Sequence, residues 1–261
     1  MRNDFNRSGK FRSLAKSDIV EFPSRGSDIK FATWRLLKQD YIVVGNVTDA
    51  GNGMVQVEYE LWDVNKQQSL LHQQMPPAPL GDLRGVAHQI ADVIYEKITG
   101  VRGAFWTRMA YITAVGLGNH TTYSLIVADS DGYNPQVVAR SKESLLSPAW
   151  SPDGRKLAFV SFADHNGPAC PANDSCPSSG EIYVVGADGT GLTRLTTSTA
   201  DDEHPTWSPD GSRIAFASGF LLASQGHPPW LMTIPSAGGS ATRIGRFSGV
   251  LDPSWSPAGI R

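Results

Sequence analysis

The sequence predicts two domains: an α+β N-terminal domain, with a mixed sheet plus helices, over residues 1–102, and an incomplete all-β propeller of about two to three blades over residues 103–261. Two observations predict this division. The first part mixes helical and strand periodicities, whereas the second part consists of short apolar runs separated by turn residues. The second part also repeats one motif three times, at residues 145–161, 202–218 and 251–261.

The composition is that of an ordinary globular protein. Of the 261 residues, 40% are hydrophobic and 18% are charged, and the formal net charge is -2. Such a chain has no overall field to attract nucleic acid, so no nucleic-acid partner is expected. No segment approaches the roughly 20 apolar residues of a membrane helix, so direct membrane insertion is not expected either.

The first domain opens with helix and strand signals. Residues 2–11 have the pattern of the last turns of a helix with a glycine stop, so we expect the first elements of this domain to be missing. Residues 28–38 place apolar side chains at helical spacing, and a buried strand is expected from Tyr41. The apolar positions of the expected helix are Ile29, Ala32, Leu36 and Leu37.

A hairpin and a long helix complete the first domain. The turn-forming residues 49–53 separate the strand at Tyr41 from residues 54–64. In the latter, apolar and polar residues alternate, which predicts a half-buried antiparallel pair. Residues 83–98 carry apolar side chains at helical intervals and end before Gly100, which predicts a helix with a glycine C-cap.

The second domain is built from repeats that centre on Trp150, Trp207 and Trp255. A strand-turn-strand pattern precedes each copy. The tryptophans are 57 and then 48 residues apart (207 minus 150, and 255 minus 207). A four-stranded propeller blade takes about 40 to 50 residues, so the longer interval contains an inserted loop.

The repeated residues have structural roles. Tryptophan is a large apolar anchor, and Ser-Pro-Asp-Gly is turn chemistry, because proline fixes φ, aspartate bonds nearby backbone N–H groups, and glycine accepts positive φ. Asp153 and Asp210 recur at the same turn. This recurrence favours a structural role over a metal ligand or an acid–base pair.

The inserted loop holds the two cysteines of the chain, Cys170 and Cys176. In an oxidising compartment they could pair as a disulfide within the loop, and otherwise they are two free thiols. Their spacing does not match a tight metal or redox motif. A zinc site would need two more ligands, and His165 is the nearby candidate.

Two segments carry a resemblance to the TolB family. Residues 100–105 read GVRGAF and are followed by Thr107, Arg108, Ala110 and Tyr111, and residues 129–134 read DSDGYN. Together with the PAWSPDG motif, this junction looks like that of TolB, which has a small α/β domain followed by a propeller. The resemblance is close over residues 2–162, and the later repeats fit the broader group of TolB-like propeller repeats.

The resemblance implies a function. TolB proteins are non-enzymatic periplasmic interaction scaffolds of the Tol-Pal system, which serves outer-membrane integrity and cell division and is exploited for colicin uptake. A Pal-like peptidoglycan-associated lipoprotein is the implied partner, with other Tol proteins and colicins as further partners. A periplasmic location follows by resemblance, although the first residues lack the apolar core of a signal peptide.

The resemblance also implies a site. Partners of the family bind at the mouth of the propeller, on the loops that precede each PxW motif, and loops on a rigid scaffold commonly carry recognition. The corresponding residues here are Ser144, Leu145, Leu146, Ser147, Asp201, Asp202, Glu203, His204, Leu251 and Asp252.

The acidic residues 201–203 in this set allow two interpretations. They could meet a basic partner or hold a calcium ion, because both need carboxylate oxygens, or they could form a solvated turn. His204 could contact a partner or could be a packed residue. No other cofactor is expected.

Two departures from the family affect these expectations. The family's export signal and first strand have no counterpart here, which leaves contact with TolA in question. The family's propeller has six blades, whereas this sequence has two full repeats and the beginning of a third. We therefore expect a truncated chain, or one that completes its ring with another copy.

Two alternative functions remain open. The sequence lacks the nucleophile elbow, the phosphate loop and the zinc-protease motif, so no enzyme activity is expected. The propeller could still be the accessory module of a hydrolase or peptidase. It could also be a fragment without function, because repeat arrays generally need three or more units to bury a continuous core.

Overall fold

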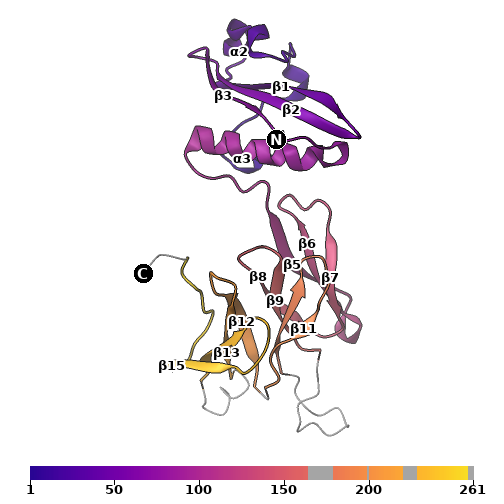
Figure 1. Cartoon of the computed structure of the whole chain (residues 1–261), viewed down its shortest axis with the longest axis vertical. Helices are drawn as coiled ribbons and strands as arrows, with labels where there is room; N and C mark the ends of the chain where they lie inside the picture. Colours follow the sequence, from indigo (N-terminus) through magenta and orange to yellow (C-terminus); the bar gives the residue numbers. More distant parts are fainter. Residues whose placement is uncertain (164–178, 199, 220–227, 258–261) are drawn as a thin grey trace. The chain divides into compact units, whose positions relative to one another are not determined.

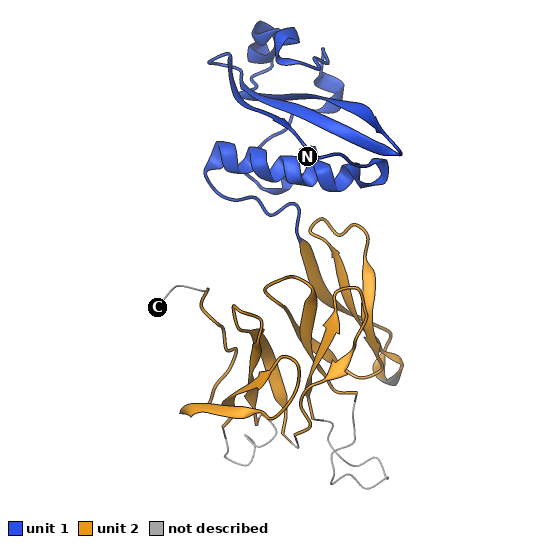
Figure 2. Cartoon of the chain, in the orientation of Figure 1, with its two compact units in different colours: residues 1–107 blue, residues 108–261 orange. Residues whose placement is uncertain are grey.

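The computed structural model describes residues 1–163, 179–198, 200–219 and 228–257. The chain forms two compact units, Met1–Thr107 and Arg108–Arg261 (Figure 2). The sequence pattern places this division after residue 102. The structure places it further along the chain, because residues 105 and 106 are still hydrogen-bonded to the preceding helix. Cys170 and Cys176 lie outside the described residues, so their pairing stays a prediction.

The first unit is an antiparallel sheet with helices on both faces (Figure 1). Its strands pair in the order β1-β2-β3, and β4 also pairs with β2. Its elements are α1 (Arg2–Arg7), 3-10 turns at Lys16–Asp18 and Gly26–Asp28, α2 (Phe31–Leu36), β1 (Tyr41–Gly51), β2 (Met54–Asp63), β3 (Gln68–Gln74), β4 (Ala78–Pro79), a 3-10 turn at Leu80–Asp82, and α3 (Leu83–Thr99).

The hairpin β1–β2 confirms the predicted alternation. Its turn uses Asn52 and Gly53, which both have positive φ, as a tight hairpin turn requires. One face of β2 buries Val57, Tyr59 and Leu61 against Val86, Ile90 and Ile94 of α3. The opposite face of the sheet packs on a second cluster around α2. The sheet is therefore covered on both sides: Ile29, Trp34, Ile42, Val44 and Val64 form the second cluster.

Helix predictions in the first unit hold in part. The helix predicted at 83–98 is α3, and Gly100 caps it in the left-handed conformation at φ 74°. The helix predicted at 28–38 is shorter, because it begins only at Phe31, after a 3-10 turn, and ends at Leu36. Its expected apolar stripe is also incomplete, since Leu36 is exposed to solvent.

Strand β3 has no counterpart in the predicted elements. Its sequence, QSLLHQQ, is polar at most positions and shows no period of two. It is the edge strand of the sheet and most of its residues are exposed, so its residues need not alternate. Pairing with β2, rather than its own pattern, makes it a strand.

The GVRGAF junction is held on α3 by one carboxylate. Asp92 accepts the backbone N–H of Phe105 at 2.7 Å and that of Trp106 at 3.0 Å. A side chain at Gly103 would collide with Asp92, since an added Cβ would lie 2.2 Å from its Oδ1. Phe105 then packs edge-on against Tyr95. The junction motif thus encodes a fixed exit from the helix.

The second unit consists of antiparallel sheets that we call blades 1, 2 and 3. The strand order is β5-β6-β7 in blade 1, β8-β9-β10-β11 in blade 2, and β12-β13-β14-β15 in blade 3. The strands are β5 (Arg108–Val115), β6 (Thr122–Asp129), β7 (Gln136–Ser141), β8 (Leu145–Trp150), β9 (Lys156–Ser161), β10 (Glu181–Gly186), β11 (Thr193–Arg194), β12 (Asp202–Trp207), β13 (Arg213–Ser218), β14 (Trp230–Pro235) and β15 (Thr242–Ser248), with a 3-10 turn at Gly118–His120.

The predicted partial propeller is confirmed, and the blade count is at the upper end of the expectation. The strands before the first PxW motif form a sheet of their own with β5, so blade 1 is three-stranded. No sheet among the described residues closes into a ring.

The blades stabilise one another through shared apolar clusters. Leu157 and Phe159 of β9 face blade 1, whereas Ala158 and Val160 of the same strand face blade 3. This alternation is the period-two pattern of a strand buried on both faces. Trp207 joins the cluster between blades 2 and 3, and its indole N–H donates to the carbonyl of Ala149 at 3.1 Å. Trp207 therefore binds blade 3 to blade 2.

The Ser-Pro-Asp-Gly turns have the predicted structural role. Ser151 Oγ donates to Asp153 at 2.6 Å, and Ser208 Oγ donates to Asp210 at 2.5 Å. Hydrogen bonds from Ser208 and from Ser212 lower the pKa of Asp210 to about 2. Gly211, like its counterpart in blade 2, has positive φ. Both aspartates are engaged in their turns.

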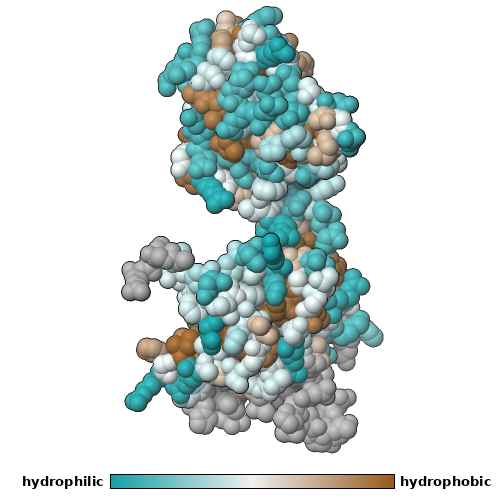
Figure 3. Space-filling model, in the orientation of Figure 1, coloured by the Kyte–Doolittle hydropathy of each residue, from teal (hydrophilic) through white to brown (hydrophobic). Residues whose placement is uncertain are grey.

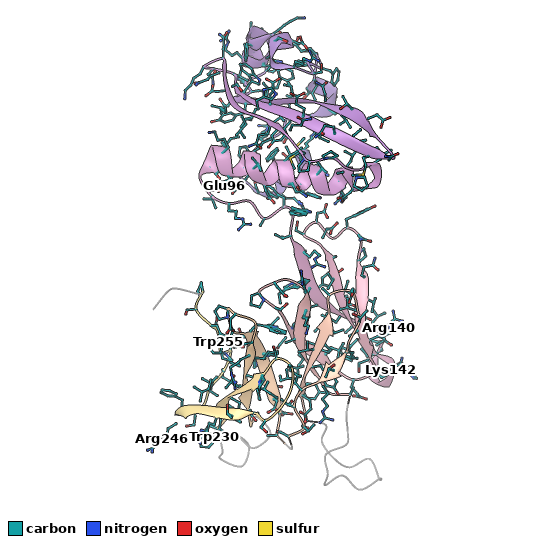
Figure 4. The ribbon with its side chains drawn as sticks, viewed as in Figure 1. Glu96, Arg140, Lys142, Trp230, Arg246 and Trp255 are labelled. Atoms are coloured by element: carbon teal, nitrogen blue, oxygen red, sulfur yellow. The ribbon has the colours of Figure 1, made fainter. Side chains whose placement is uncertain are left out.

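Replacing Asp92 tests the junction. We expect Asp92→Ala to lower the free energy of unfolding of the first unit by about 2 kcal/mol, because two hydrogen bonds to a charged acceptor are lost. Urea unfolding followed by near-UV circular dichroism measures this. Glu96→Ala, on the exposed side of the same helix, is the matched control and should change stability by less than about 0.5 kcal/mol (Figure 4). Equal effects of the two substitutions would contradict the role of Asp92.

Candidate protein-binding site

The loops before the PxW motifs share one unusual backbone feature. The residue before the motif proline has a positive φ in all three repeats: 49° at Ser147, 55° at His204 and 44° at Asp252. Left-handed φ is uncommon outside glycine, and a following proline restricts the residue further. The same conformation in three copies therefore identifies a feature of the repeat.

The left-handed residue creates a β-bulge at the start of the first strand of a blade. Pairing of β8 with β9 shifts register between Leu146 and Ala149, and pairing of β12 with β13 shifts between Glu203 and Thr206. A bulge leaves its extra residue out of the ladder and redirects the side chain. Ser147 and His204 are the residues redirected in this way.

One side-chain contact connects neighbouring repeats at this level. The imidazole Nδ1 of His204 lies 2.7 Å from Asp252 Oδ1, and its Nε2 lies 3.7 Å from Glu203 Oε2. The Asp252 side chain is 78% exposed, so this pair is open to solvent. The structure thus brings together Glu203, His204 and Asp252 from the predicted set.

The remaining predicted residues divide into exposed and buried groups. Leu146 and Leu251 are exposed apolar side chains, whereas Leu145 is part of the core between blades 1 and 2. Ser144 is half-buried, and its carbonyl accepts the N–H of Phe162. Asp201 is buried and accepts the N–H of Gly180 at 2.8 Å. Leu145, Asp201 and Asp202 therefore support the loops from within and do not face a partner.

Asp202 is buried in an unusual environment. It is 1% exposed, and its Oδ1 has no hydrogen-bond partner among the described residues. Burial, together with the negative charge of Glu181, raises the pKa of Asp202 to about 7, although a hydrogen bond from Ser218 opposes the rise. Burial also raises the pKa values of Asp201 and Glu203. Adjacent carboxylates in this loop therefore resist ionisation.

Sequence reasoning missed the residues that set this environment. Glu181 and Ser218 come from other strands, Thr196 follows β11, and folding brings all three to Asp202. No spacing signal in the sequence connects them to residues 201–203. In the part of the chain that the structure describes, no group of three or more His, Cys, Asp or Glu side chains is arranged to hold a metal ion. The calcium ion suggested by the acidic run stays a prediction.

Two domain families match the chain. The TolB amino-terminal domain matches residues 1–70, and the TolB beta propeller domain matches residues 95–170. The Tol-Pal system protein TolB of Xanthomonas campestris pv. campestris is 61% identical over 163 residues. The chain carries TolB domains. This likeness covers 62% of the chain and 37% of that relative, so the match spans well under half of the relative's length.

Other comparisons agree with the TolB assignment. TolB of Xanthomonas oryzae pv. oryzae is also 61% identical over 163 residues, again 37% of that protein. The crystal structure of TolB from Acinetobacter baumannii matches with a TM-score of 0.77 at 28% identity, over 95% of this chain and 57% of that one. The likeness of fold therefore extends past the residues of high identity. None of the helices in the described ranges has the length and apolarity needed to cross a membrane.

The raised pKa of Asp202 predicts how stability depends on pH. Since its pKa is higher in the folded chain than in the unfolded chain, the folded state binds more protons, and stability is lost as pH rises through about 7. Between pH 5 and pH 8 we expect the free energy of unfolding to fall by about 2–3 kcal/mol.

Asparagine substitutions test this pH dependence by urea unfolding at several pH values. Asp202→Asn, which mimics the protonated side chain, should remove most of the slope. Asp210→Asn is the matched control, because the pKa of Asp210 is lowered to about 2 and the group stays ionised across this range. An unchanged slope in Asp202→Asn would exclude Asp202 as its source.

Proposed function

We propose that this chain is a non-enzymatic interaction scaffold of the bacterial Tol-Pal system. The relatives that support this proposal are named Tol-Pal system protein TolB, and they share 61% identity with it over 163 residues. Along the chain, the match to the TolB amino-terminal domain precedes the match to the TolB beta propeller domain. The relatives' names and a site suited to protein recognition support this proposal.

The observation that carries the binding role is the set of left-handed residues before the motif prolines. Ser147, His204 and Asp252 occupy the same place in successive repeats and differ in chemistry: a hydroxyl, an imidazole and a carboxylate. Exposed Leu146 and Leu251 lie beside them in the chain. Polar groups of mixed character next to exposed leucines suit a protein partner better than a small-molecule substrate.

The partner proposed for this surface is a Pal-like peptidoglycan-associated lipoprotein. His204 and Asp252 can exchange their mutual contact for contacts with the partner, because the pair is solvent-exposed and exposed ion pairs contribute little to stability. Other Tol proteins and colicins are proposed as further partners. The location that fits these partners is the periplasm.

The proposed cellular role is maintenance of the outer membrane, with a part in cell division and in colicin uptake. No catalytic role is proposed, because the repeated aspartates are engaged in turns and have lowered pKa values. Such carboxylates stay ionised at neutral pH and are poor general acids.

Calorimetry with the Pal homologue of the same source tests this function. We expect the double substitution His204→Ala with Asp252→Ala to weaken Pal binding at least tenfold, because both side chains of the bridging pair are removed. Arg155→Ala is the matched control, since Arg155 is exposed in the turn between β8 and β9, at the opposite end of β8 from the bulge. Its affinity should equal that of the unmodified chain.

Two results would count against the proposal. If the unmodified chain did not bind Pal at up to millimolar concentration, the Pal-binding role would be wrong. If Arg155→Ala weakened binding as much as the double substitution, binding would take place elsewhere on the unit.

A further inference from the structure

Blades 2 and 3 present the same pair of strands with different side chains. In blade 2, Tyr183 pairs with Arg194, and in blade 3, Met232 pairs with Arg243. The segments 181–196 and 230–245 have equal length, so each residue has a counterpart. Counting from these pairs, Arg243 takes the place of Arg194, Trp230 that of Glu181, and Gly245 that of Thr196.

In blade 2 the arginine is neutralised inside the fold. Arg194 Nη2 lies 2.9 Å from Glu181 Oε1, and Glu181 is fully buried. Thr196 Oγ1 donates to the other carboxylate oxygen at 2.6 Å. The charge of Arg194 is therefore used to hold a buried carboxylate, as burial of that group requires.

In blade 3 the partners of the arginine have been exchanged. Trp230 replaces the glutamate, and the Arg243 guanidinium carbon lies 2.9 Å from the centre of its ring. Stacking on an aromatic face fixes the plane of a guanidinium and leaves its N–H donors at the edge free to bind a carboxylate. Arg243 is exposed, so its charge faces solvent rather than the blade interior.

The sequence around Arg243 contains no acidic residue. From Gly211 to Leu251 the sequence has no aspartate or glutamate, while it has Arg213, Arg243 and Arg246. Among the described residues, no carboxylate lies within ion-pair distance of Arg243 or Arg246. The outer part of blade 3 is thus a region of unbalanced positive charge.

An exposed aromatic side chain completes this surface. Phe247 is 69% exposed. It follows a break in the pairing of β14 with β15, where Gly245 has φ 63° and a Cβ would contact the Phe247 ring. Figure 3 shows apolar surface next to hydrophilic surface on the β15 side of the unit, and Figure 4 labels Trp230 and Arg246 there.

We propose that Trp230, Arg243, Arg246 and Phe247, which we call the blade 3 rim, bind an acidic polypeptide segment that carries an aromatic or aliphatic side chain beside its carboxylates. Arginine and aromatic residues are the side chains enriched in protein interfaces. An anionic membrane fits less well, because recognition of lipid headgroups takes roughly four to eight basic residues. The rim goes beyond the proposed Pal site and shares none of its residues.

Fluorescence anisotropy with an acidic peptide tests this proposal. The probe is a fluorescein-labelled peptide of 12 residues, made of glutamate with phenylalanine at every fourth position. Arg243→Gln combined with Arg246→Gln should weaken its binding at least tenfold. Trp230→Glu should weaken it to a similar extent, because it recreates the internal ion pair of blade 2.

Arg140→Gln provides the matched control. Arg140 is exposed on β7, on another side of the unit from β15, and its substitution should leave peptide affinity unchanged (Figure 4). The arginines exchanged in the double variant are solvent-exposed, so its melting temperature should match that of the unmodified chain. Pal affinity should also be unchanged in that variant, which separates this site from the proposed function.

Several outcomes would overturn the proposal. No peptide binding at up to millimolar concentration would do so, as would undiminished binding in the double arginine variant. Equal weakening by Arg140→Gln would mean that the peptide senses only the general charge of the unit. Binding to phosphatidylglycerol vesicles without binding to the peptide would assign the rim to lipid instead.

Discussion

The structure of the second unit depends on the packing of each blade against the next. A single antiparallel sheet of six-residue strands cannot bury both faces by itself, and here the apolar residues of β9 are divided between two neighbours. The indole of Trp207 adds a directional contact, because its N–H reaches a carbonyl of the preceding blade. The positions of the loops before the PxW motifs follow from this packing.

The elements that could be predicted from the sequence are those whose pattern reflects their own burial. Strand β2 alternates because one of its faces packs on α3, and the helix ending at Gly100 has both its apolar stripe and its cap in the local sequence. Strand β3 could not be predicted, because it is a polar edge strand that forms only by pairing with β2. Helix α2 could not be predicted fully for a similar reason. Its packing against the sheet, and not the expected apolar stripe, determines which of its residues are buried.

For the candidate site, the sequence and the family resemblance locate the loops but not the individual roles within them. Leu145 and Asp202 stand beside exposed residues in the sequence, and their burial depends on β9, β10 and β13, which arrive from elsewhere in the chain. The contact between His204 and Asp252 joins residues of different repeats, so no local spacing reveals it. The left-handed residues could have been suspected from their shared place before proline, yet proline alone favours an extended predecessor.

The left-handed residue before each motif proline separates the geometry of the site from its chemistry. The backbone has the same left-handed conformation at this place in each repeat, and the place is held by serine, by histidine and by aspartate. None of these three side chains belongs to the clusters that join the blades. In the proposed site, a change at one of these positions can therefore alter the contacts offered to a partner while the fold is retained. In the proposed site, repetition gives the protein a row of positions with one backbone geometry and different side chains, on which selection can act one residue at a time.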